Sequence, residues 1–104
     1  MNSLIRGTTP SLKFTYSDIE DMASINVAYL TIRQLGNNVI EKDLSSATVG
    51  SDYLLWKLTQ EETLLLRNNA KVEVQCRLKL NDGTAIASKV YEMDAVKILK
   101  DGEI

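Results

Sequence analysis

The stretch 71-KVEVQCRLKLNDGTAIASKVYEM-93 carries the clearest secondary-structure pattern in the chain. From Val72 to Leu80, apolar residues occupy every second position, and charged or amide side chains occupy the positions between them. This two-residue period is that of a strand with one buried face. The turn residues Asn81–Gly83 tolerate positive φ, and a second β-rich run follows them. The stretch therefore predicts a β-hairpin.

Further runs upstream have strand composition. Ser11–Ser17 alternates, which places three apolar side chains on one face: Leu12, Phe14 and Tyr16. Ile25–Leu35 and Val39–Leu44 are rich in β-formers and flank the turn residues Gly36–Asn38, so they predict a second hairpin. Its more plausible core face consists of Ala28, Leu30 and Ile32. Asp52–Leu58 alternates again and predicts a strand that buries Leu54, Trp56 and Leu58.

The segments between these runs are less regular. Thr59–Glu62 matches a helix capping box and predicts one short helix near residues 59–67. Ser17–Glu20 has similar spacing, but no helical period follows, so a loop crossing between sheets is the better interpretation. Ser45–Ser51 reads as a surface connection, and residues 1–9 as a loosely held arm. Residues 92–100 fit either a short amphipathic helix or a final strand, and we favour the strand.

Together these elements predict an all-β fold. Six to eight short strands at regular intervals indicate an antiparallel immunoglobulin-like β-sandwich with one short helix. The length of 104 residues suits a single domain over residues 1–104. The apolar fraction of 44% and the charged fraction of 25% are ordinary for a globular protein.

Charge and hydropathy narrow the classes of partner. A formal net charge of -2, with acids and bases mixed, supplies no basic stripe for nucleic acid. No apolar run approaches the roughly 20 residues of a membrane-spanning helix. No apolar segment follows Arg6, so no secretory signal is predicted and we expect synthesis in the cytoplasm.

The residues that usually carry reaction chemistry are scarce. The chain has no histidine and one cysteine, Cys76, which we expect to be a small buried hydrophobe. Asp82 reads as a turn former, and the pairs Glu20/Asp21 and Glu61/Glu62 as solvated or capping carboxylates. We therefore expect no catalytic, cofactor-binding or metal-binding residues, no cofactor and no enzyme activity.

Two groups of apolar residues bear on binding. A glycan-binding sandwich needs exposed, coplanar aromatic rings, whereas Phe14 and Trp56 lie on alternating apolar faces and are predicted to be core. Leu55 and Leu64–Leu66 exceed what one small helix and one strand face need. These leucines either fill the core or make a contact with another copy or another protein.

Four segments carry a family resemblance: IRGTTPSLKF (5–14), TIRQLGNNVIEKDL (31–44), LTQEETLLL (58–66) and VEVQCRLKLNDGTAIAS (72–88). From about Arg6 onward the chain resembles small immunoglobulin-like proteins encoded among the virion, tail and baseplate genes of phages and prophages of Gram-positive bacteria. The resemblance implies a non-enzymatic structural or assembly protein that contacts other tail proteins or copies of itself as a homo-oligomer. It also implies synthesis in the bacterial host cytoplasm and a place in the virion once assembled. The alternatives are a glycan- or host-protein-binding module and an inhibitor or regulator of a host protein.

Overall fold

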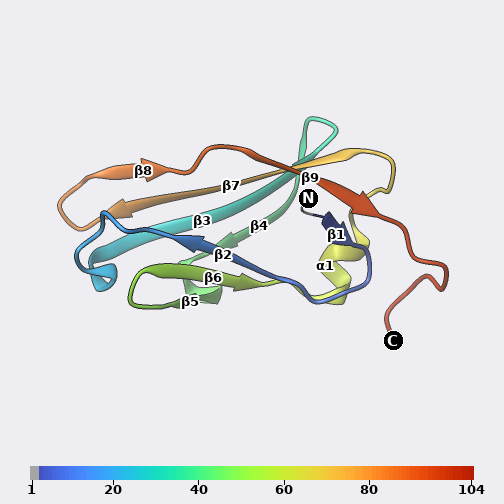
Figure 1. The fold of residues 1–104 in the computed structure, drawn as a ribbon, viewed down its shortest axis with the longest axis horizontal. Coiled ribbons are helices and arrows are strands. Elements are labelled where there is room, and N and C mark those ends of the chain that lie inside the picture. Colours follow the sequence, from blue (N-terminus) through green and yellow to red (C-terminus); the bar gives the residue numbers. More distant parts are fainter. Residues whose placement is uncertain (1–2) are drawn as a thin grey trace.

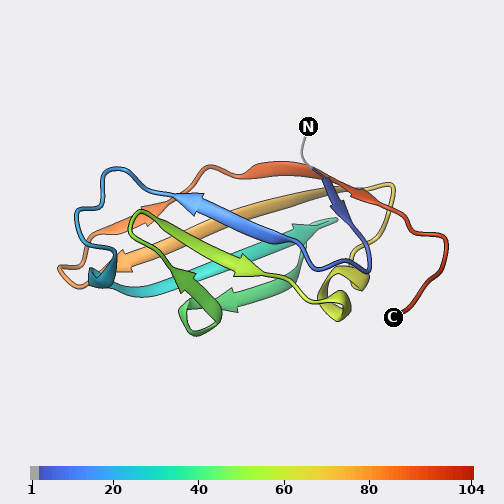
Figure 2. The ribbon, with the colours of Figure 1, turned by 60° about the horizontal axis from the view of Figure 1, so that its bottom comes forward.

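The computed structural model describes residues 3–104, whose strands form two sheets lying face to face (Figures 1 and 2). Sheet A has the order β1 (Ser3–Ile5), β9 (Tyr91–Val96), β7 (Lys71–Leu80), β3 (Ile25–Gln34) and β4 (Asn37–Asp43), and β8 (Ala85–Ala87) also pairs with β7. Sheet B has the order β2 (Ser11–Thr15), β6 (Tyr53–Lys57) and β5 (Ala47–Val49). The predicted all-β sandwich is confirmed, although the described part of the chain has nine strands rather than the expected six to eight.

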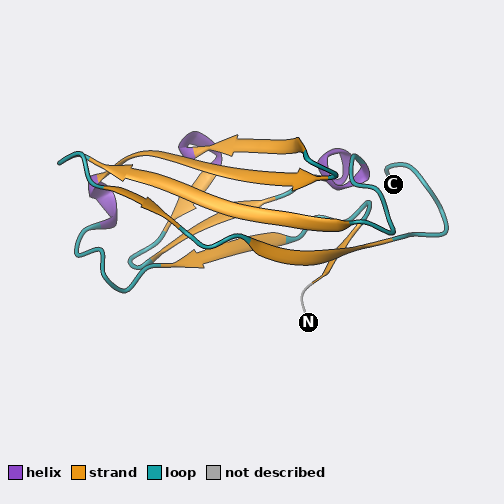
Figure 3. Cartoon of the chain, turned by 90° about the horizontal axis from the view of Figure 1, so that it is seen from above, coloured by secondary structure: helices purple, strands orange, loops and turns teal. Residues whose placement is uncertain are grey.

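Helical segments occupy only connections between strands (Figure 3). They are the helix α1 (Gln60–Leu64) and the 3-10 turns at Met22–Ser24 and Leu44–Ser46. No helix within residues 3–104 has the length and apolar character needed to cross a membrane.

The hairpin predicted within residues 71–93 is present, and its first strand, β7, lies in the middle of sheet A. Strand β7 pairs with β3 on one side and with β8 and β9 on the other. Its alternating apolar residues are all buried up to Leu78, whereas Leu80 is half-buried. Gly83 takes a φ of 93° in the turn, and the Leu80 N–H donates to the Thr84 carbonyl at 2.9 Å.

The core face of β3 is confirmed, because Ala28, Leu30 and Ile32 are fully buried. The turn to β4 lies earlier than predicted. Gln34 pairs with Asn37, so the two turn residues are Leu35 and Gly36, with φ values of 53° and 78°. A two-residue hairpin turn needs positive φ at both positions, and this register leaves Asn37 and Asn38 inside β4.

Leucine is therefore an unfavourable residue at position 35, because the turn requires a positive φ there. Its side chain is 63% exposed and its backbone lies in the left-handed region, which costs a leucine about 1 kcal/mol. We expect Leu35→Asn to raise the free energy of unfolding by about 0.5–1 kcal/mol, measured by urea denaturation, because asparagine tolerates positive φ. A Leu35→Val variant, which is β-branched, should lower it. Equal stability of the two variants would contradict the assigned turn.

The predicted helix near residues 59–67 is confirmed as α1 with its capping box. The Thr59 hydroxyl accepts from the Glu62 N–H at 3.1 Å, and the Glu62 carboxylate accepts from the Thr59 N–H at 2.9 Å. The preceding strand buries Leu54, Trp56 and Leu58 as predicted. The loop between β2 and β3 crosses between the sheets as predicted, with one turn capped by Asp21.

The expected loose arm over residues 1–9 is wrong for the part that the structure describes. Strand β1 pairs with β9, in parallel rather than antiparallel, and Leu4 is buried. The Arg6 guanidinium donates to the carbonyls of Leu66 at 2.7 Å and Leu64 at 3.1 Å. The end of a helix leaves carbonyls without partners, and Arg6 supplies donors from a distant part of the sequence. Residues 1 and 2 lie outside the described residues.

The structure corrects the expectation for residues 45–51 and settles the choice between helix and strand for residues 92–100. Ser45–Ser51 is not only a connection, because β5 pairs with β6 after a turn capped by Asp43. Residues 92–100 adopt the favoured strand up to Val96, the end of β9, and have no regular structure beyond it.

Candidate interaction surfaces

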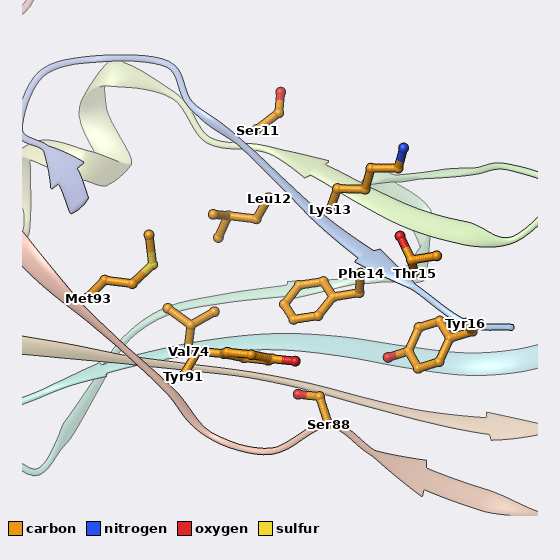
Figure 4. Close-up of a pocket in the computed structure, with 10 residues that line it drawn as sticks. All are labelled: Ser11, Leu12, Lys13, Phe14, Thr15, Tyr16, Val74, Ser88, Tyr91 and Met93. Carbon is orange, nitrogen blue, oxygen red and sulfur yellow. The ribbon is translucent and has the colours of Figure 1, made fainter. Parts of the chain in front are cut away.

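A cavity opens at one side of the sandwich, between β2 of sheet B and β9 of sheet A (Figure 4). It has a volume of about 630 Å³, within the range of ligand and peptide pockets. Its walls combine apolar and aromatic residues with polar ones: Leu12, Phe14 and Tyr16 from the β2 side face Val74, Tyr91 and Met93, and the remaining lining residues are Ser11, Lys13, Thr15 and Ser88. The Phe14 and Tyr91 rings lie 6.4 Å apart and are tilted by 58°.

The cavity opens where the strand opposite β7 is interrupted. Arg77 pairs with Ala87 and Val74 pairs with Tyr91, so β7 advances three residues while the opposite chain advances four. This mismatch of one residue interrupts the pairing in the way that a β-bulge does. The interruption separates β8 from β9 and leaves Ser88 at the wall of the cavity.

Polar groups at the base of the cavity bond to one another. The Tyr16 hydroxyl donates to Cys76 Sγ at 3.1 Å, and Ser88 Oγ accepts from the Cys76 N–H at 3.0 Å. Burial raises the pKa of Tyr16 and that of the Cys76 thiol. The prediction that Cys76 is a buried hydrophobe is confirmed, and no buried side-chain nitrogen or oxygen within residues 3–104 lacks a partner.

We expect Cys76 to resist thiol reagents in the native protein. The thiolate is the reactive form, and a raised pKa together with full burial suppresses both its formation and its access. At pH 8 the reaction with a disulfide reagent should be at least about tenfold slower for the native chain than for the same chain in guanidinium. Comparable rates in the two states would contradict the burial of Cys76.

The outer edge of β2 carries backbone groups without partners. The Tyr16 N–H donates to Asp52 and the Leu58 N–H to Pro10, so Leu12 and Phe14 are the residues of β2 that bond to β6. The N–H and C=O groups of Ser11, Lys13 and Thr15 therefore point away from β6. No residue within 3–104 bonds to them.

A second surface lies at the end of the sandwich where β1, α1 and the C-terminus meet (Figure 1). We call it the α1 end and define it by its exposed apolar residues: Ile5, Leu65, Val96, Leu99 and Ile104. The tail is held there, because Asp101 pairs with Arg6 at 3.2 Å and the Gln60 side chain bonds to the Ile104 backbone at 2.8 Å and 3.2 Å.

The spare leucines predicted from the sequence divide between core and surface. Leu66 is buried, Leu55 and Leu64 are half-buried, and Leu65 is 57% exposed. Trp56 lies in the core, where its indole N–H donates to the Asp43 carbonyl at 2.9 Å, whereas Phe14 is only half-buried and lines the cavity.

The carboxylates of Asp82, Glu61 and Glu62 lie in a turn and at the start of a helix. Asp82 accepts from the Thr84 N–H in its turn, and Glu61 and Glu62 lie in the first turn of α1. No cluster of three metal-ligating side chains occurs within residues 3–104.

The Glu62 carboxylate links α1 to sheet A. Lys42 Nζ lies 2.9 Å and 3.1 Å from its two oxygens, and both side chains are largely buried. Burial alone would raise the pKa of Glu62, but the hydrogen bonds from Thr59 and the contact with Lys42 together lower it below the ordinary 4.5. A carboxyl whose pKa is lower in the folded state stabilises the fold above its unfolded pKa, and this stabilisation is lost as pH falls.

We therefore expect the free energy of unfolding to fall as pH decreases from about 4.5, with Glu62 as one source of the slope. Glu62→Gln should cost about 1–3 kcal/mol at pH 7 and should flatten this dependence, because the charged hydrogen bonds are lost. Glu61→Gln, at an exposed neighbouring position, is the control. Denaturation between pH 3 and pH 7 measures both, and identical slopes for wild type and Glu62→Gln would contradict the ion pair.

Comparison with known proteins bears on the fold. Neither a protein-family model nor a curated protein matches the chain. Among solved structures it is similar to the Ig-like domain of mouse leukocyte-associated immunoglobulin-like receptor 1, which was crystallised as a strand-swapped dimer. The two chains are 17% identical, the TM-score is 0.53, and the match covers 93% of this chain and 91% of that chain. The fold is immunoglobulin-like. Antibody-type immunoglobulin-like sandwiches join their sheets by a disulfide, whereas here the Tyr16 to Cys76 hydrogen bond links the two layers.

Proposed function

We propose that this chain is a non-enzymatic structural or assembly protein of a phage or prophage particle, of tail or baseplate type, and that it acts through protein–protein contacts. The viral context rests on the resemblance of the four sequence segments quoted above. The contact-making role rests on one observation: five large exposed apolar residues lie on the chain segments that meet at the α1 end.

The α1 end supports this role because hydrogen bonds tie together the chain segments that carry its apolar residues. Arg6 connects β1, the end of α1 and the tail residue Asp101. Leu99 is 98% exposed, and the tail that carries it bonds to the rest of the chain at Asp101 and Ile104. Exposed apolar side chains gathered in one region are typical of surfaces that bind another protein.

The direct test is the composition of purified particles. Particles released after prophage induction, or from phage growth, would be purified by density gradient and analysed by quantitative mass spectrometry. We expect the chain in the particle fraction at a fixed copy number. Its presence in the lysate together with its absence from intact particles would overturn the proposal.

A variant locates the contact. Replacing Leu65 and Leu99 with glutamine removes apolar area from the α1 end, which we expect to reduce incorporation about thirtyfold if each side chain contributes about 1 kcal/mol. Val49→Thr, at an exposed apolar position on β5, is the matched control and should be incorporated normally. Equal incorporation of both variants would remove the α1 end from the contact.

Glycan binding is the weaker candidate. Trp56 is buried, and the two rings at the cavity, Phe14 and Tyr91, are tilted rather than coplanar. A sugar-stacking platform needs flat, exposed rings.

A further inference from the structure

We infer that the open edge of β2 is a docking site for an extended segment of a different protein, with apolar residues at alternate positions and a carboxylate opposite Lys13. This inference deepens the proposed function, because it names how one partner in the assembly is held. The added segment would extend sheet B by one strand, a recognition mode in which backbone hydrogen bonds supply affinity and side-chain pockets supply specificity.

Addition of a strand first requires unpaired backbone groups at a sheet edge, and β2 provides them. Ser11, Lys13 and Thr15 direct their N–H and C=O groups to the edge, and no residue within 3–104 accepts or donates there. An unpaired row of this kind is a template for another strand.

The cavity provides the second requirement. Because side chains alternate across a strand, a segment paired with β2 would place every second side chain beside Leu12 and Phe14. Those two residues form an apolar part of the wall of the cavity of about 630 Å³, with Tyr91 and Met93 on the opposite wall. The space suits branched apolar side chains from an added strand.

The other edges lack this combination. Strands β1, β5 and β8 are three residues long, and β9 is covered by β1 except at its first three residues, 91–93. Strand β4, at the far edge of sheet A, has a pairing irregularity at Ile32/Arg33 and carries mainly polar or charged residues. The large cavity borders β2 and is lined by no residue of β1, β4 or β5.

Charge decides between a second copy and a different protein. If the β2 strands of two copies paired in antiparallel, only one register would pair all three outward-facing residues, Ser11, Lys13 and Thr15. That register places Lys13 directly opposite Lys13 of the second copy. Like charges in that position destabilise a sheet, and lysine on an edge strand discourages self-association. Lys13 Nζ lies 4.5 Å from the centroid of the Tyr53 ring and forms no ion pair within residues 3–104, so it is available to a carboxylate on the added strand. Lys89, beside Tyr91 at the opposite wall, adds further positive charge.

The test uses the full chain and the synthetic peptide acetyl-STVEVTS-amide. Antiparallel to β2, this peptide places its glutamate opposite Lys13 and its valines opposite Leu12 and Phe14. In NMR titrations we expect the amides of Lys13 and Thr15 to shift and to exchange with solvent at least about tenfold more slowly. The matched peptide acetyl-STVKVTS-amide should bind about tenfold more weakly, because a like charge replaces an opposite one.

Two protein variants make the result specific. Lys13→Glu should reverse the preference between the two peptides. Thr15→Pro removes an outward N–H and leaves the bonds to β6 intact, so it should abolish peptide binding while Trp56 emission stays unchanged, and Thr15→Val should bind normally.

Three outcomes would overturn the inference: no shift at millimolar peptide, a preference that Lys13→Glu leaves unchanged, or protection of Lys13 and Thr15 that grows with protein concentration without peptide. The last would identify a second copy as the occupant. None of these outcomes affects whether the chain is found in purified particles, so failure of the docking site is distinguishable from failure of the proposed function.

Discussion

Replacing Trp56 with alanine should destabilise the native state by about 3–5 kcal/mol, the largest effect we expect from a single substitution. Trp56 is fully buried between the sheets, with Phe14 edge-on at 6.0 Å, and its indole N–H donates to Asp43. Its removal leaves a cavity and a carbonyl without its partner. A loss of this size is a large share of the stability of a typical small domain.

Guanidinium denaturation followed by circular dichroism measures this effect without the tryptophan signal. Trp56→Phe is the control, because it keeps most of the apolar volume and should cost clearly less than the alanine variant. A loss below about 1 kcal/mol for Trp56→Ala would mean that Trp56 is not enclosed by the two sheets.

The second large effect is expected at Leu4. Its side chain is 1% exposed although it comes from a three-residue strand near the start of the chain. Leu4→Ala should lower the free energy of unfolding by about 2–5 kcal/mol, because it removes a buried side chain and weakens the parallel pairing of β1 with β9.

Leu99→Ala is the matched control for Leu4→Ala. The same side chain is deleted, but Leu99 is almost fully exposed, so its loss should change stability by less than about 0.5 kcal/mol. Urea denaturation of the two variants compares them. Equal stability would restore the expectation of a loose arm and contradict the placement of β1.

Local patterns in the sequence predicted most of the fold. The alternation in β7, the core face of β3 and the capping box of α1 each depend on residues close together in the chain, so each can be recognised in the sequence itself. Strand β1 was missed because its partners, β9 and the end of α1, lie far along the sequence. The turn at Leu35 was misplaced because pairing register, rather than residue preference, decides which residues take positive φ.

The candidate surfaces were less accessible to sequence reasoning. The cavity forms where the interruption near Ser88 faces the edge of β2, and both conditions depend on how the sheets are assembled. One signal was present: Lys13, at the middle of an alternating strand that begins after Pro10, is typical of an exposed sheet edge. The sequence left open whether the additional leucines fill the core or lie on the surface, and the structure shows that Leu65 lies on the surface.

Amide hydrogen exchange in the dilute, unliganded protein tests most directly whether this immunoglobulin-like sandwich leaves β2 open. The N–H groups of Leu12 and Phe14 bond to β6 and should exchange slowly, whereas those of Lys13 and Thr15 point outward and should exchange rapidly. This alternation along one strand is the predicted result. Uniform protection of all four amides would show that the edge is already covered and would contradict the open edge on which the docking site depends.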